Sequence, residues 1–169
     1  MSELSEFRRA KDHFMEHEHD SPLTHEQARR FQGLSYFDED PTLRFELDLE
    51  RYEVEEVIEM QTSTGDVASY LRRGKVSFEV DGEPAQLTVY KDSDGKGFFL
   101  PFADGTSGDE TYGAGRYLDL HELADGRLLV DFNYAYNPYC AYNESWSCPL
   151  TPFENRLRVP IRAGEKSFK

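Results

Sequence analysis

The sequence predicts a mainly β fold of the α+β class, in which an antiparallel meander forms a barrel or a two-layer sandwich. Three observations support this prediction. Apolar residues recur at helical spacing only near the N-terminus, later segments alternate with a period of two, and short turn sequences separate those segments. Consecutive strands joined by short turns pair antiparallel, and about eight strands close into a barrel or stack in two layers.

At 169 residues the chain has the size of one ordinary domain, and no linker-like composition interrupts it. We therefore expect a single domain over residues 1–169. It divides into an N-terminal helical segment, residues 1–33, and a β domain, residues 34–169, which contains an ordered loop at 131–155.

Two helices are expected in the first segment. The first spans residues 3 to about 18, with Ser2 as its N-cap. Its helical spacing is carried by Leu4, Phe7, Lys11 and Phe14. The second is short and runs up to Phe31, and it starts at Thr24, because Gln27 three residues later completes a capping-box pattern.

Eight strands are expected after the helices. They are residues 43–49, 55–62, 67–72, 75–80, 85–91, 97–101, 115–121 and 127–132. Gly-containing turns at 63–66, 73–74, 81–82, 94–95 and 125–126 separate several of them. Residues 156–161 could add a last strand at a sheet edge, since Pro160 is unsuitable for a central strand.

The charge of the chain excludes some partners. It has 33 acidic and 19 basic residues, a net charge of −14, and Arg is more frequent than Lys. Such a surface repels phosphate backbones, so nucleic-acid binding is disfavoured. Acidic residues spread along the whole chain suggest a halophilic protein whose surface is adapted to high salt, although an acidic mesophilic protein is the alternative.

The chain also lacks sequence features of membrane proteins. No apolar run approaches the roughly 20 residues that cross a bilayer, and the first residues lack the apolar core of a signal peptide. We expect a soluble cytoplasmic protein without a membrane partner. The sequence defines no oligomeric state.

The most unusual segment is residues 131–155, which we name the aromatic loop. It holds the single Trp, both Cys residues and several Tyr and Pro residues. Asn-Pro and Cys-Pro steps prevent a regular helix or strand there, so we expect an ordered loop. Ordered loops with large side chains usually carry function or close a core.

A second unusual segment, residues 101–117, is rich in Gly and ends at Arg116 and Tyr117. Its spacing does not match a P-loop. We predict that this glycine-rich segment and the aromatic loop line a pocket for a small molecule, with an anionic metabolite as the candidate ligand. The predicted ligand-binding residues are Arg116, Tyr117, Asp131, Asn133, Tyr136, Asn137, Cys140 and Glu154.

Arg116 has two interpretations in this site. Its guanidinium could grip an anionic group of the ligand, or it could be a structural partner for Asp131 or Glu154. The alternative to a binding protein is an enzyme that uses Cys140 as nucleophile or Glu154 as base beside Arg116. A third interpretation gives both segments a purely structural role.

The cysteines leave three interpretations open: buried thiols, a disulfide or redox pair, and metal ligands. Zinc would need two further ligands, and the spacing of Cys140 and Cys148 is not a usual zinc motif. His13 and His17 share a helix face, but no third ligand is evident. We therefore predict no metal site, and no cofactor is indicated.

Several long motifs carry a resemblance to a known family. They are SPL at 21–23, FQGLSYF at 31–37, PFADGTSGDETYGAGRYLDL at 101–120, DFNYAYNPYCAYNESWSCPLTPFENRL at 131–157 and IRAGEK at 161–166. The chain resembles prokaryotic proteins grouped as domain of unknown function 1684. The resemblance implies no activity, but it implies that the two long motifs act together with 154–155 and 163–166. It is also in keeping with a halophilic archaeal source.

Overall fold

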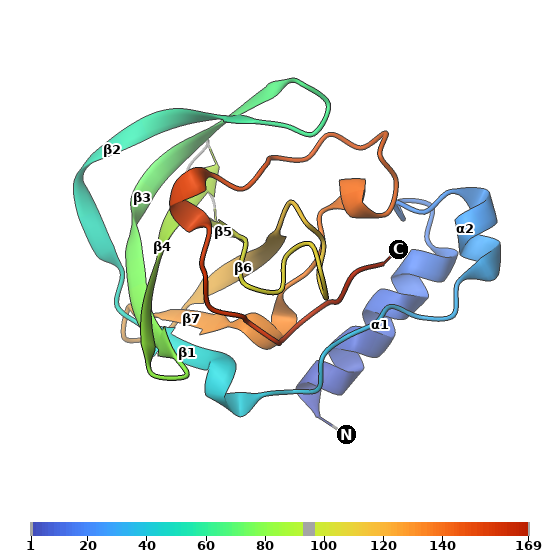
Figure 1. Ribbon diagram of the computed structural model, residues 1–169, viewed down its shortest axis with the longest axis horizontal. Helices are drawn as coiled ribbons and strands as arrows, with labels where there is room; N and C mark the ends of the chain where they lie inside the picture. The colour runs from blue at the N-terminus through green and yellow to red at the C-terminus, as the bar shows by residue number, and fades with distance from the viewer. Residues whose placement is uncertain (1, 93–96, 169) are drawn as a thin grey trace.

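The protein is a curled antiparallel sheet with two helices beside it (Figure 1). The structure is a computed structural model and describes residues 2–92 and 97–168. Within these ranges the helices are α1 (Glu3–His17) and α2 (His25–Arg30). The strands are β1 (Arg44–Leu47), β2 (Glu50–Gln61), β3 (Val67–Val80), β4 (Glu83–Asp92), β5 (Phe98–Phe102), β6 (Arg116–Glu122) and β7 (Leu128–Asp131). Short 3-10 helices are η1 (Pro41–Leu43), η2 (Phe132–Tyr134), η3 (Tyr139–Ala141) and η4 (Phe153–Asn155).

The described strands form one sheet in the order β1-β7-β6-β5-β4-β3-β2, and every neighbouring pair is antiparallel. Strands β2 to β7 are a meander, and β1 adds to its far edge beside β7. The predicted mainly β fold is confirmed. The sheet curls into a half-barrel, so in the described part of the chain β1 and β2 remain as edges.

One predicted turn is wrong, because residues 67–72 and 75–80 belong to the single strand β3. Gly74 sits inside that strand, where the pairing with β4 shifts register. A Cβ atom on residue 74 would lie 2.5 Å from the carbonyl oxygen of Glu50. The glycine therefore permits close approach of β2 in a bent strand and does not form a turn. The turn predicted at 94–95 lies outside the described residues.

The predicted edge strand at 156–161 is also wrong. This segment makes one isolated bridge, between Arg156 and Ala103. Further along, the amide of Gly105 donates to the carbonyl oxygen of Val159 at 2.8 Å. The neighbour of residues 156–161 at this point is therefore the loop that contains Gly105, and not a strand. Pro160 has no N–H group to continue a ladder.

The core lies between the concave face of the sheet and the C-terminal part of the chain, which crosses the open side of the half-barrel (Figure 1). Val159, Ile161 and Ala163 are buried against the sheet. The sheet contributes Val76, Phe78, Val80, Ala85, Leu87, Val89, Leu100, Phe102, Leu118, Leu120, Leu128 and Val130 to the same cluster. Extended chain rather than a second sheet therefore covers the apolar face.

Both N-terminal helices form where the sequence predicts them. The hydroxyl of Ser2 caps α1, and Thr24 and Gln27 make the predicted capping box of α2. Leu4 and Met15 are the buried residues of α1. In the described part of the chain, no helix combines the length and apolarity required to cross a bilayer.

Candidate functional site

The aromatic loop contains the short helices η2, η3 and η4 joined by irregular chain, and polar side chains tie it to neighbouring segments. Asp131 caps η2 by accepting from the amide of Asn133. The Asn133 side chain accepts from the amide of Asp40 and donates to its carbonyl oxygen, both at 2.9 Å. Asn133 is buried, so its amide group ties the loop to the segment before β1.

Arg116 is completely buried at the start of β6, and its guanidinium binds the C-terminal segment. It donates to the carbonyl oxygens of Ile161, Ala163 and Glu165. Its acidic partner is Asp104, with Nη2 3.4 Å from Oδ1. Burial lowers the pKa of Arg116, and the charge of Asp104 opposes that shift.

Asn137 belongs to a second buried network, which is centred on Glu165. The backbone N–H of Asn137 donates to Oε2 of Glu165 at 2.7 Å, and the Tyr142 hydroxyl donates to the same atom at 2.5 Å. Lys11 of α1 places Nζ 2.6 Å from Oε1 of the same carboxylate. Burial, followed by the negative charge of Glu165, raises the pKa of Tyr142. This network attaches α1 to the aromatic loop and the C-terminal segment.

Glu154 lies on η4 and contacts β3 and β4. Arg72 donates to it from Nε at 3.0 Å and from Nη2 at 2.8 Å, and the Tyr90 hydroxyl donates as well. Although burial raises the pKa of Glu154, the hydrogen bonds from Arg72 and Tyr90 lower it below its ordinary value. The partner of Glu154 is therefore Arg72 and not Arg116.

Cys140 and Cys148 are free, buried thiols. The amide of Cys140 donates to Sγ of Cys148 at 3.2 Å, and the Tyr112 hydroxyl lies 3.7 Å from Sγ of Cys140. A hydrogen bond from the Cys148 thiol lowers the pKa of Cys140 to about 6. Tyr117 packs in the same cluster. The described residues contain no group of three His, Cys, Asp or Glu side chains that could hold a metal ion.

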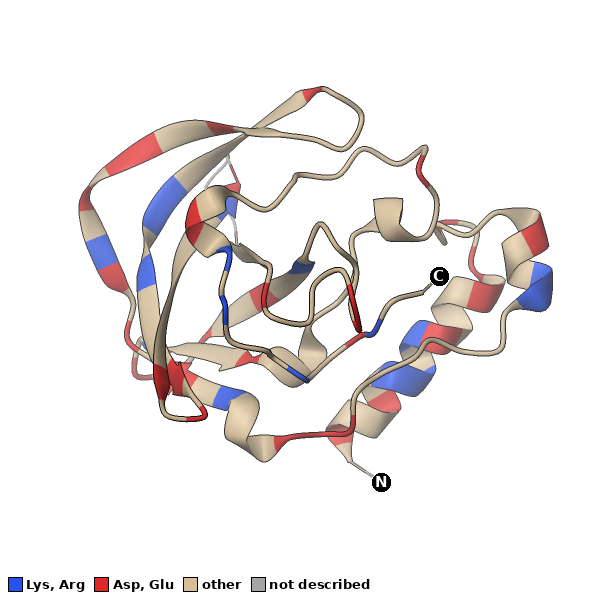
Figure 2. Ribbon diagram, viewed as in Figure 1, with Lys and Arg blue, Asp and Glu red and all other residues tan. Residues whose placement is uncertain are grey.

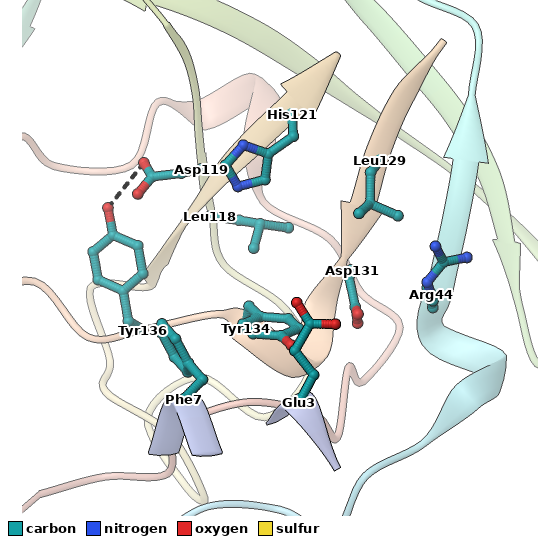
Figure 3. A pocket seen from close by; sticks show the side chains of 10 residues that line it. All are labelled: Glu3, Phe7, Arg44, Leu118, Asp119, His121, Leu129, Asp131, Tyr134 and Tyr136. Carbon is teal, nitrogen blue, oxygen red and sulfur yellow. Dashed lines mark hydrogen bonds between the residues drawn. The ribbon is translucent and has the colours of Figure 1, made fainter. Parts of the chain in front are cut away.

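An open pocket lies between α1 and the outer faces of β6 and β7 (Figure 3). Its volume is about 290 Å³. It is lined by Glu3, Phe7, Arg44, Leu118, Asp119, His121, Leu129, Asp131, Tyr134 and Tyr136. Apolar and aromatic walls with a few polar groups are the usual composition of small-ligand sites, whose volumes begin at about 300 Å³.

The pocket carries more negative than positive charge. Glu3, Asp119 and Asp131 supply three carboxylates, and none of them forms an ion pair with a described residue. The hydroxyl of Tyr136 donates to Asp119 at 3.1 Å. The guanidinium of Arg44 is 3.2 Å from Glu46, outside the lining. The pocket is therefore suited to a ligand that supplies positive charge.

Of the predicted ligand-binding residues, Asp131 and Tyr136 line this pocket. The others lie elsewhere, in the networks and the cluster described above: Arg116, Tyr117, Asn133, Asn137, Cys140 and Glu154. The prediction missed Asp119 and His121, although alternation in β6 places both on the face opposite Leu118 and Leu120. It also missed Glu3 and Phe7, because only the docking of α1 brings them to the sheet.

Comparison with known proteins identifies the family to which the chain belongs. The model of the family described as Protein of unknown function (DUF1684) matches residues 29–166. The chain belongs to this family. The resemblance of its long motifs is thus confirmed. This DUF1684 protein is also similar to an uncharacterized protein of Haloarcula marismortui whose structure was solved in solution by NMR. The two share 37% sequence identity and a TM-score of 0.73, over 96% of this chain and 91% of the other. A comparison with curated proteins finds no match.

Proposed function

We propose that this DUF1684 protein binds a small organic molecule carrying an amine, in the pocket between α1, β6 and β7. The observation that carries the proposal is the lining: three carboxylates without an ion-pair partner among the described residues, next to aromatic rings. A carboxylate pairs with an ammonium group, and an aromatic face attracts a cation at about 6 Å or less. Phe7, Tyr134 and Tyr136 supply such rings.

An anionic ligand held by Arg116 is less compatible with this geometry. The Nη atoms of Arg116 already donate to three backbone carbonyls and to Asp104, and its side chain has no exposed surface. A ligand would have to break that network to reach the guanidinium. In this proposal Asp131 and Tyr136 contact the ligand, and the other six predicted residues support the fold around the pocket.

The test is isothermal titration calorimetry with putrescine and tetramethylammonium, with succinate as a matched dianionic probe. We expect the cations to bind and succinate not to bind. The combined change Glu3→Gln and Asp119→Asn should weaken binding by up to about 30-fold, since each exposed charge contact contributes up to about 1 kcal/mol.

Two further variants sharpen this test. Glu6→Gln makes the same change in the first turn of α1, outside the lining, and should leave binding unchanged. Leu129→Trp places a large ring in the pocket and should abolish binding of both cationic probes. Equal weakening by Glu6→Gln would mean that the charge of the whole protein, and not the pocket, attracts the probe.

We also infer that the protein works at high salt, in the cytoplasm. Acidic residues are spread over strands, loops and helices rather than gathered in one patch (Figure 2), and the chain has a net charge of −14. The similar protein comes from Haloarcula marismortui. Two free cysteines support a reducing compartment.

A further inference from the structure

We propose that Cys140 and Cys148 form a reactive dithiol that a hydroperoxide oxidises to an intramolecular disulfide. This modification site is separate from the pocket between α1, β6 and β7, because neither cysteine lines that pocket. The proposal rests on the positions of the two thiols, on the donors around them and on the small part of their surface that is exposed.

The two side chains are already neighbours. Sγ of Cys148 lies 3.2 Å from the backbone nitrogen of Cys140, and both side chains belong to the same buried cluster. The two cysteines are therefore direct neighbours in one buried cluster. Bond formation requires the sulfurs to close to about 2.05 Å, and the short intervening chain of the aromatic loop keeps the two residues together.

The surroundings stabilise a negative charge on this pair. Cys148 Sγ accepts from the backbone amide of Cys140, which belongs to η3. The Tyr112 hydroxyl lies 3.7 Å from Sγ of Cys140. These donors let the two thiols hold one proton between them, so that one sulfur is a thiolate near neutral pH.

Access to the pair is narrow. Cys140 and Cys148 have 4% and 6% of their surfaces exposed. Tyr112, Tyr117 and Tyr139 pack around them. A peroxide molecule is small enough to reach a sulfur through such a covering, whereas a disulfide-bonded peptide such as oxidised glutathione is too large. The oxidant class that fits the site is therefore a small hydroperoxide.

The reaction balances with hydrogen peroxide alone. The Cys140 thiolate attacks one peroxide oxygen, the O–O bond breaks, and Cys140 becomes a sulfenic acid while hydroxide leaves. That hydroxide takes the proton of Cys148 and becomes water. The Cys148 thiolate then attacks Sγ of Cys140, forms the S–S bond and expels the second hydroxide. Two electrons pass from the sulfurs to the peroxide.

The experiment treats the full chain with equimolar hydrogen peroxide, unfolds it, alkylates it with iodoacetamide and reads the product by mass spectrometry. We expect both cysteines to resist alkylation, a mass lower by two hydrogens, and full recovery with dithiothreitol. Oxidised glutathione at the same concentration should react far more slowly. Alkylation of both thiols after peroxide treatment would overturn the proposal, as would oxidised protein found only as disulfide-linked dimers.

Variants assign the roles of the two sulfurs. Cys148→Ser removes the second thiol, so a sulfenic acid on Cys140 should persist and be trapped by dimedone. Tyr112→Phe keeps both thiols and removes one donor. It should slow oxidation and move the pH midpoint of thiol reactivity upward from about 6. If Cys148→Ser unfolds the chain, Tyr112→Phe still decides the matter: an unchanged rate and midpoint would contradict the assigned thiolate.

Discussion

The guanidinium of Arg116 and the carboxylate of Asp104 together clamp the C-terminal segment onto the sheet. Arg116 donates to the carbonyl oxygen of Ile161 at 2.9 Å, and Asp104 accepts from the amide of the same residue at 2.6 Å. Both side chains are fully buried, and their nitrogen and oxygen atoms are 3.4 Å apart. The carbonyl oxygen of Ile161 is thus bound by a positive side chain, and its N–H group by a negative one.

Replacement of Arg116 by Met should destabilise the protein strongly. It leaves the Asp104 charge buried without its cation and removes the donors for three carbonyl oxygens. The free energy of unfolding, measured by urea denaturation, should fall by about 3–5 kcal/mol. Arg127→Met, at an exposed arginine paired with Asp125, should change it by less than about 1 kcal/mol. Equal effects at both positions would refute the clamp.

Lys11→Met should loosen helix α1 from the body of the protein. The Glu165 carboxylate, only 1% exposed, would lose the ammonium group 2.6 Å away. We expect a loss of about 3 kcal/mol and faster amide hydrogen exchange in α1. In a double-mutant cycle with Glu165→Gln, the two losses should not add. Lys75→Met, in a more exposed pair with Glu50, is the matched control and should leave exchange in α1 unchanged.

Glu154 should make a pH-dependent contribution to stability. Burial alone would raise its pKa, but Arg72 and Tyr90 hold the pKa in the folded state below the ordinary 4.5. A carboxylate with a lowered pKa stabilises above its unfolded pKa, and this stabilisation is lost as the pH falls through the folded-state value. The difference in unfolding free energy between wild type and Glu154→Gln should therefore be constant at neutral pH and shrink below pH 4.5.

The matched control for Glu154 is Glu59→Gln on β2. Glu59 is exposed, and its side chain makes no hydrogen bond or ion pair with a described residue. The difference in unfolding free energy between wild type and Glu59→Gln should show no such decline between neutral pH and pH 4. A parallel decline for both variants would assign the effect to the overall acidic charge and not to the contacts with Arg72.

Salt should stabilise the whole protein. With 33 acidic residues against 19 basic ones, self-repulsion is strong at low ionic strength, where the screening length is about 30 Å, and weak at 1 M, where it is about 3 Å. The midpoint of thermal unfolding should rise steeply between dilute buffer and 2 M potassium chloride. Equal stability in dilute buffer would instead indicate an ordinary acidic protein. Sucrose, which is excluded from surfaces without screening charge, should reproduce little of the increase.

Local patterns predicted much of the fold. The capping box at Thr24 and Gln27 specifies the start of α2 because both partners lie within one turn. Alternation and short turns predicted the meander for the same reason, since each depends on residues close in sequence. The turn predicted at Gly74 is wrong because the glycine is required for another purpose. The backbone of Glu50 packs against it, and Glu50 belongs to the neighbouring strand, which local sequence does not reveal.

The sequence by itself singled out the side chains that needed a partner or a role: Arg116, the asparagines of the aromatic loop and the two cysteines. Only the tertiary structure decided what each contacts. Arg116 is paired with Asp104 rather than Asp131 or Glu154, and helix α1 brings Glu3 and Phe7 to strands β6 and β7. The physical reason is that a side chain's type reports its burial and hydrogen-bonding needs, whereas the partner that satisfies them is set by how distant segments pack.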